Sequence, residues 1–369
     1  MENENKGLKI IMISLIIIII ILIIAIVIAL LMKNKNNTNK IDSLYTEKAI
    51  ATMKDIEIYD KVLEYSKTVE VMLENNKLKK EYLNKYFDID YIETKDFTTL
   101  INTLLDKNYS IEEINYITSN YKDNINILLN MDYINILQFQ NIKNFDISKV
   151  NRYLDYHEKN NYDLATSVTY VNIGLDLKGY STYTSYTLEE ATDISILVNK
   201  YHKLPDDYEP NDLVSLSYNK NYQLRKEAAE AFEKLTSAGI NDNVIFYPFS
   251  PYRSYKTQSV LYNRYKARDG EEEADTYSAR PGFSEHQLGL AVDVRSNTLS
   301  DNLTKKDYEW MLNNSYKYGF IIRYPKGKQY ITQFIEEPWH LRYLGVDLAT
   351  KVTESGLTYD EYYDIYLKN

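Results

Sequence analysis

The longest apolar run of the chain covers residues 10–32, where Ser14 is the only polar side chain. A helix rises about 1.5 Å per residue, so this run reaches roughly 35 Å, enough to cross a hydrocarbon layer of about 30 Å with some tilt. A core helix usually keeps a polar face, and a signal-peptide core is shorter and is followed by small residues at a cleavage site. We therefore expect an uncleaved transmembrane anchor over 10–32, preceded by a short cytoplasmic tail over 1–9.

Glycine and proline divide the remaining chain near residue 170. Neither occurs between Gly7 and Gly174, whereas all seven prolines lie at or after Pro205. Folds built from strands and tight turns need these residues, and helical arrays can largely do without them. The chain is therefore expected to be helical over 33–169 and to form a mixed domain over 170–369.

Weak self-similarity within the helical region indicates repeats. The stretches KNYSIEEINYI and KNFDISKVNRYL begin at Lys107 and Lys143, 36 residues apart. In each, Ser110 or Asp146 precedes an amphipathic run and can cap a helix, because its side-chain oxygen accepts an unpaired first-turn N–H. We expect short helix–turn–helix repeats over 33–169. They are interpreted as a spacer between membrane and C-terminal domain, and binding of a wall polymer or partner protein is the alternative.

Beyond residue 170 the hydrophobic period alternates between that of helices and that of strands. The expected order is a helix over 224–239, a strand over 243–249, a helix over 254–267, a strand over 288–294, a helix over 304–319 and a hairpin over 320–340. A hairpin and further strands beside separate helices predict an α+β fold with a mostly antiparallel sheet.

The charge balance and the lack of cysteine exclude several classes of partner and of catalytic site. Lys and Arg total 43 against 53 for Asp and Glu, so the formal net charge is -10, and no basic stripe interrupts this balance. Nucleic acid is therefore not an expected partner, since phosphate binding needs a basic face. Cysteine is absent, which excludes disulfides, thiolate metal sites and a cysteine nucleophile. Any metal must be bound by His, Asp or Glu.

Two of the four histidines have a carboxylate at a spacing that could bring both side chains to one metal ion. His286 precedes Asp293 by seven residues. A flat strand would hold the two on opposite faces, so they converge only if the chain bends, and residues 287–289 offer a place for that. Glu337 precedes His340 by three residues, with a proline between them that favours a bulge or an edge position.

Two histidines and one carboxylate form a three-ligand set that leaves the fourth zinc position open for water. A carboxylate beside the metal, but not bound to it, would serve as general base. Arg253 is a third polar feature, placed directly after one expected strand and before a helix. His157 and His202 have no such partners and are interpreted as structural. The spacing alone thus predicts a catalytic metal site in the C-terminal domain.

Three motifs of this domain closely resemble those of the VanY-type D-alanyl-D-alanine carboxypeptidases, a zinc-peptidase group that also includes LD-carboxypeptidases. They are SPYRSYKTQ from residue 250, YSARPGFSEHQLGLAVDV from residue 277 and EPWHLRYLG from residue 337. The patterns S-x-H-x-x-G-x-A-x-D and E-x-x-H, in this order, are specific. The resemblance covers about residues 170–369 and implies the Hedgehog/DD-peptidase-like fold, a small α+β zinc domain.

The resemblance also implies the roles of the residues that the spacing had indicated. It places a Zn²⁺ cofactor on His286, Asp293 and His340. It makes Glu337 the catalytic base and Arg253 the arginine that polarises the substrate carbonyl.

Two further residues are expected to bind substrate: Ser284 from the S-x-H motif, and by extension Gln258. Phe283 and Leu288 stand where relatives often have His and Thr. Neither position is a ligand or the base, so these departures bear on the shape of the pocket.

The implied reaction is hydrolysis of the terminal peptide bond of peptidoglycan stem peptides, with Glu337 moving the proton and Arg253 stabilising the oxyanion. Two lysines precede residue 10 and three follow soon after residue 32. Because positive charge is enriched on the cytoplasmic side of a membrane span, this count slightly favours an N-terminus outside the membrane. The implied substrate, however, lies outside the cytoplasmic membrane, and we give this argument more weight than the lysine count. We therefore predict a single-pass membrane protein with an extracellular catalytic domain. LD-carboxypeptidase activity on tetrapeptide stems, endopeptidase activity on cross-links and non-catalytic wall binding by an inactive peptidase domain remain alternatives.

Overall fold

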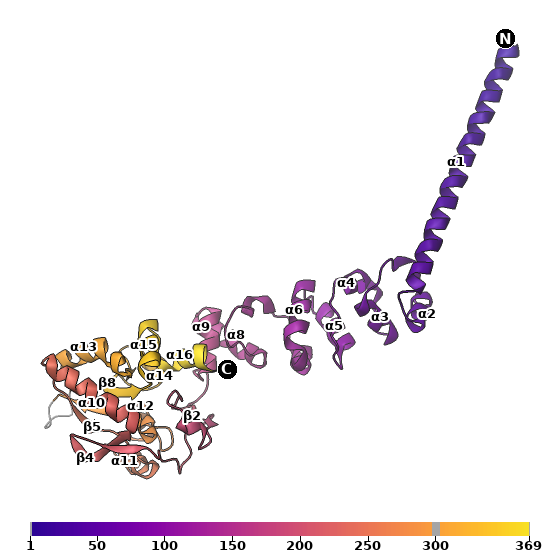
Figure 1. The fold of residues 1–369 in the computed structure, drawn as a ribbon. Helices are drawn as coiled ribbons and strands as arrows, with labels where there is room; N and C mark the ends of the chain where they lie inside the picture. Colours follow the sequence, from indigo (N-terminus) through magenta and orange to yellow (C-terminus); the bar gives the residue numbers. More distant parts are fainter. Residues whose placement is uncertain (1, 297–302, 369) are drawn as a thin grey trace. The chain divides into compact units, whose positions relative to one another are not determined.

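The computed structural model describes residues 2–296 and 303–368, without the side chains of 2–14, 31 and 34–39. The described chain forms two compact units, residues 1–141 and 142–369 (Figure 1). The division precedes the change in composition near residue 170. Residues 142–169 therefore belong to the same unit as the mixed domain.

Every element described within the first unit is helical, as the lack of glycine and proline predicted. Its α-helices are α1 (Glu2–Asp42), α2 (Glu47–Asp55), α3 (Lys67–Glu74), α4 (Leu83–Phe87), α5 (Phe97–Asp106), α6 (Ile111–Tyr121) and α7 (Ile125–Asn130). Ser110 caps α6 through a capping box with Glu113. Asp146, in the second unit, caps a short turn by accepting the N–H of Ser148. Both expected caps are confirmed.

A tyrosine contact recurs among the helices. Tyr86 accepts the backbone N–H of the residue seven positions earlier at 3.3 Å and donates its hydroxyl to Asn102 at 2.6 Å. Tyr153 makes the same pair of contacts, again with the residue seven positions earlier at 3.3 Å and with Asn172 at 2.7 Å. Both rings are buried. The same pair of tyrosine contacts thus occurs once in each of the two units.

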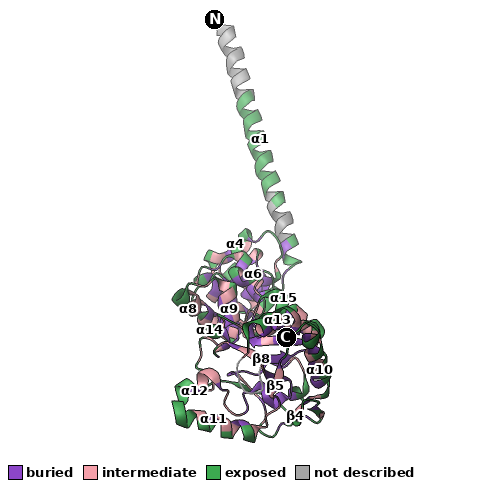
Figure 2. Cartoon of the chain, turned by 90° about the vertical axis from the view of Figure 1, so that its left-hand side faces the viewer, coloured by how far each residue is buried: buried purple, intermediate pink, exposed green. Residues whose placement is uncertain are grey.

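Helix α1 contains the apolar run. Residues 15–30 are all exposed (Figure 2), whereas the side chains of 10–14 and 31, part of the predicted anchor over 10–32, lie outside the described residues. Within the part of the chain that the structure describes, no helix combines the length and hydropathy needed to span a bilayer.

The second unit begins with two helices and continues as the mixed domain. Its helices are α8 (Val150–Asn160), α9 (Leu164–Asn172), α10 (Lys226–Asn241), α11 (Tyr255–Asp269), α12 (Glu271–Tyr277), α13 (Lys305–Asn314), α14 (Gln329–Thr332), α15 (Val346–Ser355) and α16 (Tyr359–Tyr362). Its strands are β1 (Thr184–Ser185), β2 (His202–Lys203), β3 (Leu213–Leu216), β4 (Asn219–Arg225), β5 (Tyr247–Ser250), β6 (Ala291–Arg295), β7 (Phe320–Tyr324) and β8 (Glu337–Tyr343). This is the expected α+β class.

The main sheet has four strands in the order β5-β6-β8-β7, and all its pairings are antiparallel. β3 and β4 form an antiparallel hairpin, and β1 and β2 a short parallel pair. The mostly antiparallel sheet is therefore confirmed.

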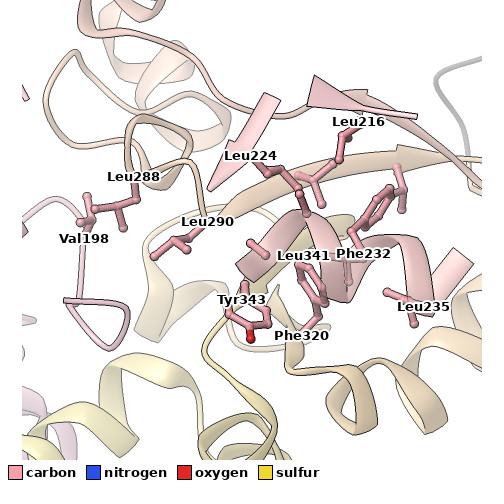
Figure 3. Packing of buried hydrophobic residues seen from close by; sticks show 14 of the residues in the cluster. Val198, Leu216, Leu224, Phe232, Leu235, Leu288, Leu290, Phe320, Leu341 and Tyr343 are labelled. Carbon is pink, nitrogen blue, oxygen red and sulfur yellow. The ribbon is translucent and has the colours of Figure 1, made fainter. Parts of the chain in front are cut away.

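Alternation along the central strands separates the core from the polar face. Val292 and Leu341 are fully buried in the main hydrophobic core. The same core contains Phe232 of α10 and Phe320 of β7, shown with Leu341 in Figure 3. Because successive strand residues point to opposite faces, Asp293 must project from the other side of the sheet. Since one face of the sheet packs against α10, the polar side chains of β6 and β8 lie on the opposite face.

One expected element is wrong. The hairpin over 320–340 has its strands β7 and β8, but β8 begins only at Glu337. The segment predicted as its earlier part forms the short helix α14, after which Gln333 has a left-handed φ of 62°. Ile331 and Thr332 are consecutive and both buried, a pattern that a helical turn permits and a strand with one solvated face does not.

Candidate active site

His286 lies in a single 3₁₀ turn, Glu285–Leu288, immediately before β6. Gly289 ends the turn with a φ of 67°, in the left-handed region. A Cβ there would lie 2.9 Å from a methyl carbon of Leu213, so both the backbone angle and the available space favour glycine. This is the bend that brings His286 towards Asp293, and the prediction of a bend at residues 287–289 is confirmed.

Strand register brings the other two polar residues together. Asp293 of β6 pairs directly with His340 of β8. The pairing of β7 with β8 shifts between Ile322, opposite Leu341, and Tyr324, opposite Glu337. The irregularity falls in the part of β8 that contains the proline, as expected, and Glu337 lies near His340, with 3.6 Å between Oε2 and Nδ1.

The candidate ligand atoms form a compact cluster. One atom each from His286, Asp293 and His340 lies within 4.8 Å of the other two, and all three residues are buried. Nε2 of His286 is 3.4 Å from Oδ2 of Asp293, and Nδ1 of His340 is 3.1 Å from Oδ1. The two imidazole rings meet edge to face, with centroids 4.8 Å apart.

In each imidazole, the nitrogen that points away from Asp293 makes a hydrogen bond, and this bond determines whether the nitrogen facing Asp293 is free to bind a metal. Nδ1 of His286 is 2.8 Å from the carbonyl oxygen of Pro251, which can only accept a hydrogen bond. Nε2 of His340 is 3.2 Å from the carboxylate of Glu285, an acceptor when ionised. Each ring therefore donates outward and turns its other nitrogen towards Asp293. Imidazoles that bind a metal are oriented in this way.

This donor set fits a divalent cation. The buried Oδ1 of Asp293 has no hydrogen bond of acceptable geometry, although Nδ1 of His340 is close to it. When His340 is neutral, an acceptor faces an acceptor here, and either a second proton on the ring or a cation removes the repulsion. Two neutral imidazoles and one carboxylate are typical ligands of zinc in sites that keep a position open.

Burial and neighbouring charges shift the ionisation of the cluster. Burial and the nearby Arg253 lower the pKa of His286 to about 4. Burial alone would lower the pKa of His340, but the carboxylates of Asp293 and Glu285 raise it to about 9. Burial raises the pKa of Glu337 to about 8, against the opposing effect of His340. A carboxyl group with a raised pKa is a stronger base once ionised.

A cavity of about 790 Å³ opens onto this cluster, and all the predicted site residues line it. Arg253 reaches it from the loop between β5 and α11, and its Nε lacks a hydrogen-bond partner. Burial lowers the pKa of Arg253, whereas Asp293 and Glu337 raise it. The side chain thus offers an unused donor beside two carboxylates.

Gln258 and Ser284 lie in the wall of the same cavity and are buried. Nε2 of Gln258 donates to the carbonyl oxygen of Ala279 at 2.7 Å. Since that partner can only accept, the amide oxygen of Gln258 is fixed as the free end, and it has no hydrogen-bond partner. The cavity wall at Gln258 therefore contains a buried acceptor without a partner, the kind of group that can recognise an N–H.

Sequence reasoning missed the carboxylate that holds His340. Glu285 stands between two motif residues but has no neighbour in the sequence that marks a role. In the structure its side chain has no exposed surface and contacts Arg323 of β7 at 2.8 Å and Arg342 of β8 at 3.0 Å. The sequence does contain one indication of a buried carboxylate, because each of the apolar strand segments FIIRY and HLRYL contains an arginine that needs a partner.

Comparison with known proteins assigns this domain to a family. Residues 221–346 match the family model of VanY, D-alanyl-D-alanine carboxypeptidase. A putative carboxypeptidase, YodJ of Bacillus subtilis (strain 168), is 40% identical over 190 residues, which are 48% of this chain and 70% of that protein. A bifunctional D-Ala-D-Ala dipeptidase and D-Ala-D-Ala carboxypeptidase, VanXYC of Enterococcus gallinarum, is 33% identical over 177 residues, or 46% of this chain and 92% of that protein.

Solved structures of similar sequence include both specificity classes. The LdcB LD-carboxypeptidase is 38% identical, with a TM-score of 0.46, and the match covers 50% of this chain and 90% of that one. A VanY D,D-pentapeptidase mutant in complex with Zn(II) is 36% identical, with a TM-score of 0.42 and coverage of 46% and 97%. From the family model and the curated relatives, the chain belongs to the VanY D-alanyl-D-alanine carboxypeptidase family, and its buried His–Asp–His cluster is the candidate metal site of a zinc-dependent carboxypeptidase.

Proposed function

We propose that this enzyme removes the terminal D-alanine from peptidoglycan stem peptides ending in D-alanyl-D-alanine. The observation that supports hydrolysis at a metal site most strongly is the buried carboxylate of Asp293, whose two oxygens each lie near one of two oriented imidazoles, beside a cavity of about 790 Å³. A pocket of that volume accommodates a short peptide end. Non-catalytic wall binding is disfavoured because the expected ligands, base and arginine are all present in the cavity wall.

We assign the metal to His286, Asp293 and His340. When bound there, zinc supplies a Lewis acid that polarises a carbonyl and lowers the pKa of water. Glu337 accepts the proton of the attacking water and returns it to the leaving amine. Arg253 donates to the carbonyl oxygen as that oxygen gains negative charge.

Substrate orientation is assigned to the cavity wall. The amide oxygen of Gln258 accepts an N–H of the peptide, because its own NH₂ group is held by Ala279. Ser284 contributes a hydroxyl that can both donate and accept. Together they hold the scissile bond against the polar face of β6 and β8.

We further propose that the apolar segment of α1 attaches the enzyme to the membrane, with the catalytic domain outside. Residues 15–30 form a continuous exposed apolar surface, and exposed apolar patches of that extent mark interaction sites or membrane contact. Of the helical region over 33–169, the part up to residue 141 then acts as a spacer, because residues 142–169 form one unit with the catalytic domain over 170–369.

Muropeptides test the substrate assignment. The full chain should release D-alanine from pentapeptide muropeptides, and mass spectrometry should show a product shorter by one alanine. Release from tetrapeptide muropeptides alone would instead assign LD-carboxypeptidase activity. Binding of both without cleavage would indicate a non-catalytic wall-binding protein.

Removing a ligand should remove the metal. His286→Ala, Asp293→Ala and His340→Ala should each weaken zinc binding by more than about 100-fold, since even residues that only contact the ligands typically contribute 10–100-fold. Zinc content is measured by elemental analysis of the purified chain, together with turnover. Full zinc content in any one of these variants would exclude that residue as a ligand.

A second set of variants distinguishes the role of the catalytic base from that of the metal ligands. Glu337→Gln should retain zinc but lower kcat by about 10²–10⁴-fold, the usual contribution of a positioned general base. Glu336→Gln is the matched control, because Glu336 precedes β8 and does not line the described cavity. Comparable kcat losses in both variants would contradict the assignment.

Membrane attachment is tested by fractionation. The full chain should remain in the membrane pellet after alkaline carbonate extraction, and a chain without residues 1–40 should be released, since the apolar surface of α1 is then absent. Protease added to intact cells should digest the C-terminal domain. Protection of that domain would place it on the inner side and contradict the proposed orientation.

A further inference from the structure

A second set of buried charges lies behind the candidate metal site and reaches the C-terminal helix. Arg323 donates from Nε to Glu285 at 2.8 Å and forms two bonds to Asp360, from Nη1 at 2.6 Å and from Nη2 at 3.2 Å. Glu285 in turn contacts Nε2 of His340 at 3.2 Å. An unbroken series of hydrogen bonds therefore joins Asp360, in α16, to a candidate ligand in β8.

The start of α16 fixes the position of Asp360. Thr358 and Glu361 form a capping box, in which each side chain bonds the backbone N–H of the other. Asp360 lies in the first turn, where a negative charge is favoured by the unpaired N–H groups of the helix. Asn199 also donates to its carboxylate at 2.8 Å. The carboxylate is thus held from its helix, from a loop and from β7.

The charges in this network balance. Glu285, Asp360, Arg323 and Arg342 are all buried, and each arginine contacts Glu285. Removing one member of a buried ionic group leaves an uncompensated charge, which is far less favourable than the intact set. Without Asp360, two guanidinium groups would compete for the single carboxylate that holds His340.

We infer that Asp360 is a positioning residue of the metal centre: through Arg323 it orients Glu285, which fixes the ring of His340 with Nδ1 turned towards Asp293. Arg342 is already held by backbone oxygens of Ile194 and Ile196 at 2.9 and 2.8 Å. Arg323 depends on Asp360 for its two outer bonds. The C-terminal helix thereby contributes to zinc affinity without touching the metal.

The inference rests on the proposed ligand set, and one pair of variants separates it from a general effect on folding. Asp360→Asn keeps the shape of the side chain but removes the charge. Asp364→Asn is the matched control, because Asp364 is equally buried in the same C-terminal segment but contacts Lys368 at 3.6 Å and Asn172 at 3.4 Å.

Zinc affinity is measured on the full chain in detergent, by competition with a chromogenic chelator after metal removal. Near-UV circular dichroism of each variant confirms that it is folded. Asp360→Asn should raise the Kd for zinc by about 10–100-fold, the range typical of residues that orient a ligand. Asp364→Asn should leave the Kd unchanged. Asp360→Glu, which keeps the charge, should recover part of the affinity.

A folded Asp360→Asn chain with the Kd of the unmodified protein would overturn the inference, as would an equal loss in Asp364→Asn. If Asp360→Asn does not fold, the zinc Kd of Asn199→Ala decides. This variant keeps the charge of Asp360 and removes one donor to it, together with the amide oxygen that accepts the N–H of Tyr201 at 2.9 Å and lies 2.9 Å from Nδ1 of His202. It should raise the Kd at least about threefold. An unchanged Kd in that variant would equally overturn the inference. Absence of zinc binding by the unmodified chain would instead contradict the ligand set itself.

Discussion

The arrangement of polar side chains at the candidate site depends on the ion pairs of one fully buried carboxylate, that of Glu285. An ionised group with no access to water is strongly unfavourable unless several charged donors surround it. Here Arg323, Arg342 and His340 supply those donors, and they hold the pKa of Glu285 below its usual range, although burial would raise it. The same bonds orient His340, so the stability of the carboxylate and the geometry of the candidate metal site have one origin.

Alternation along two strands gives the domain both a core and a site. Leu341 packs with Phe232 and Phe320 on one face of the sheet, and its neighbour His340 lies opposite Asp293 on the other. A slip of one residue in this register would bury the polar side chains against α10 and expose the apolar ones. The apolar core is therefore what secures the distance between the two candidate ligands.

Some features followed from local pattern, and others did not. Helix caps such as Ser110 and the bend ending at Gly289 depend on a few neighbouring residues, and both were predictable. The helix α14 was not, because YITQFI has a pattern that fits a strand as well as a turn, and contacts with the rest of the domain decided between them. The arginines of β7 and β8 were visible as polar residues in apolar strands, but nothing nearby indicated their partner.

The sequence by itself determined the α+β class, the helical region before it, the apolar segment near the N-terminus and the residues that gather at the candidate site, because periodicity and spaced motifs carry that information locally. Only the tertiary structure decided which imidazole nitrogen faces Asp293, that Glu285 holds His340, and that Asp360 lies behind both. The bond of Glu285 to His340 spans 55 residues, and that of Arg323 to Asp360 spans 37. Partners at such separations are chosen by strand register and helix placement, which no local pattern contains.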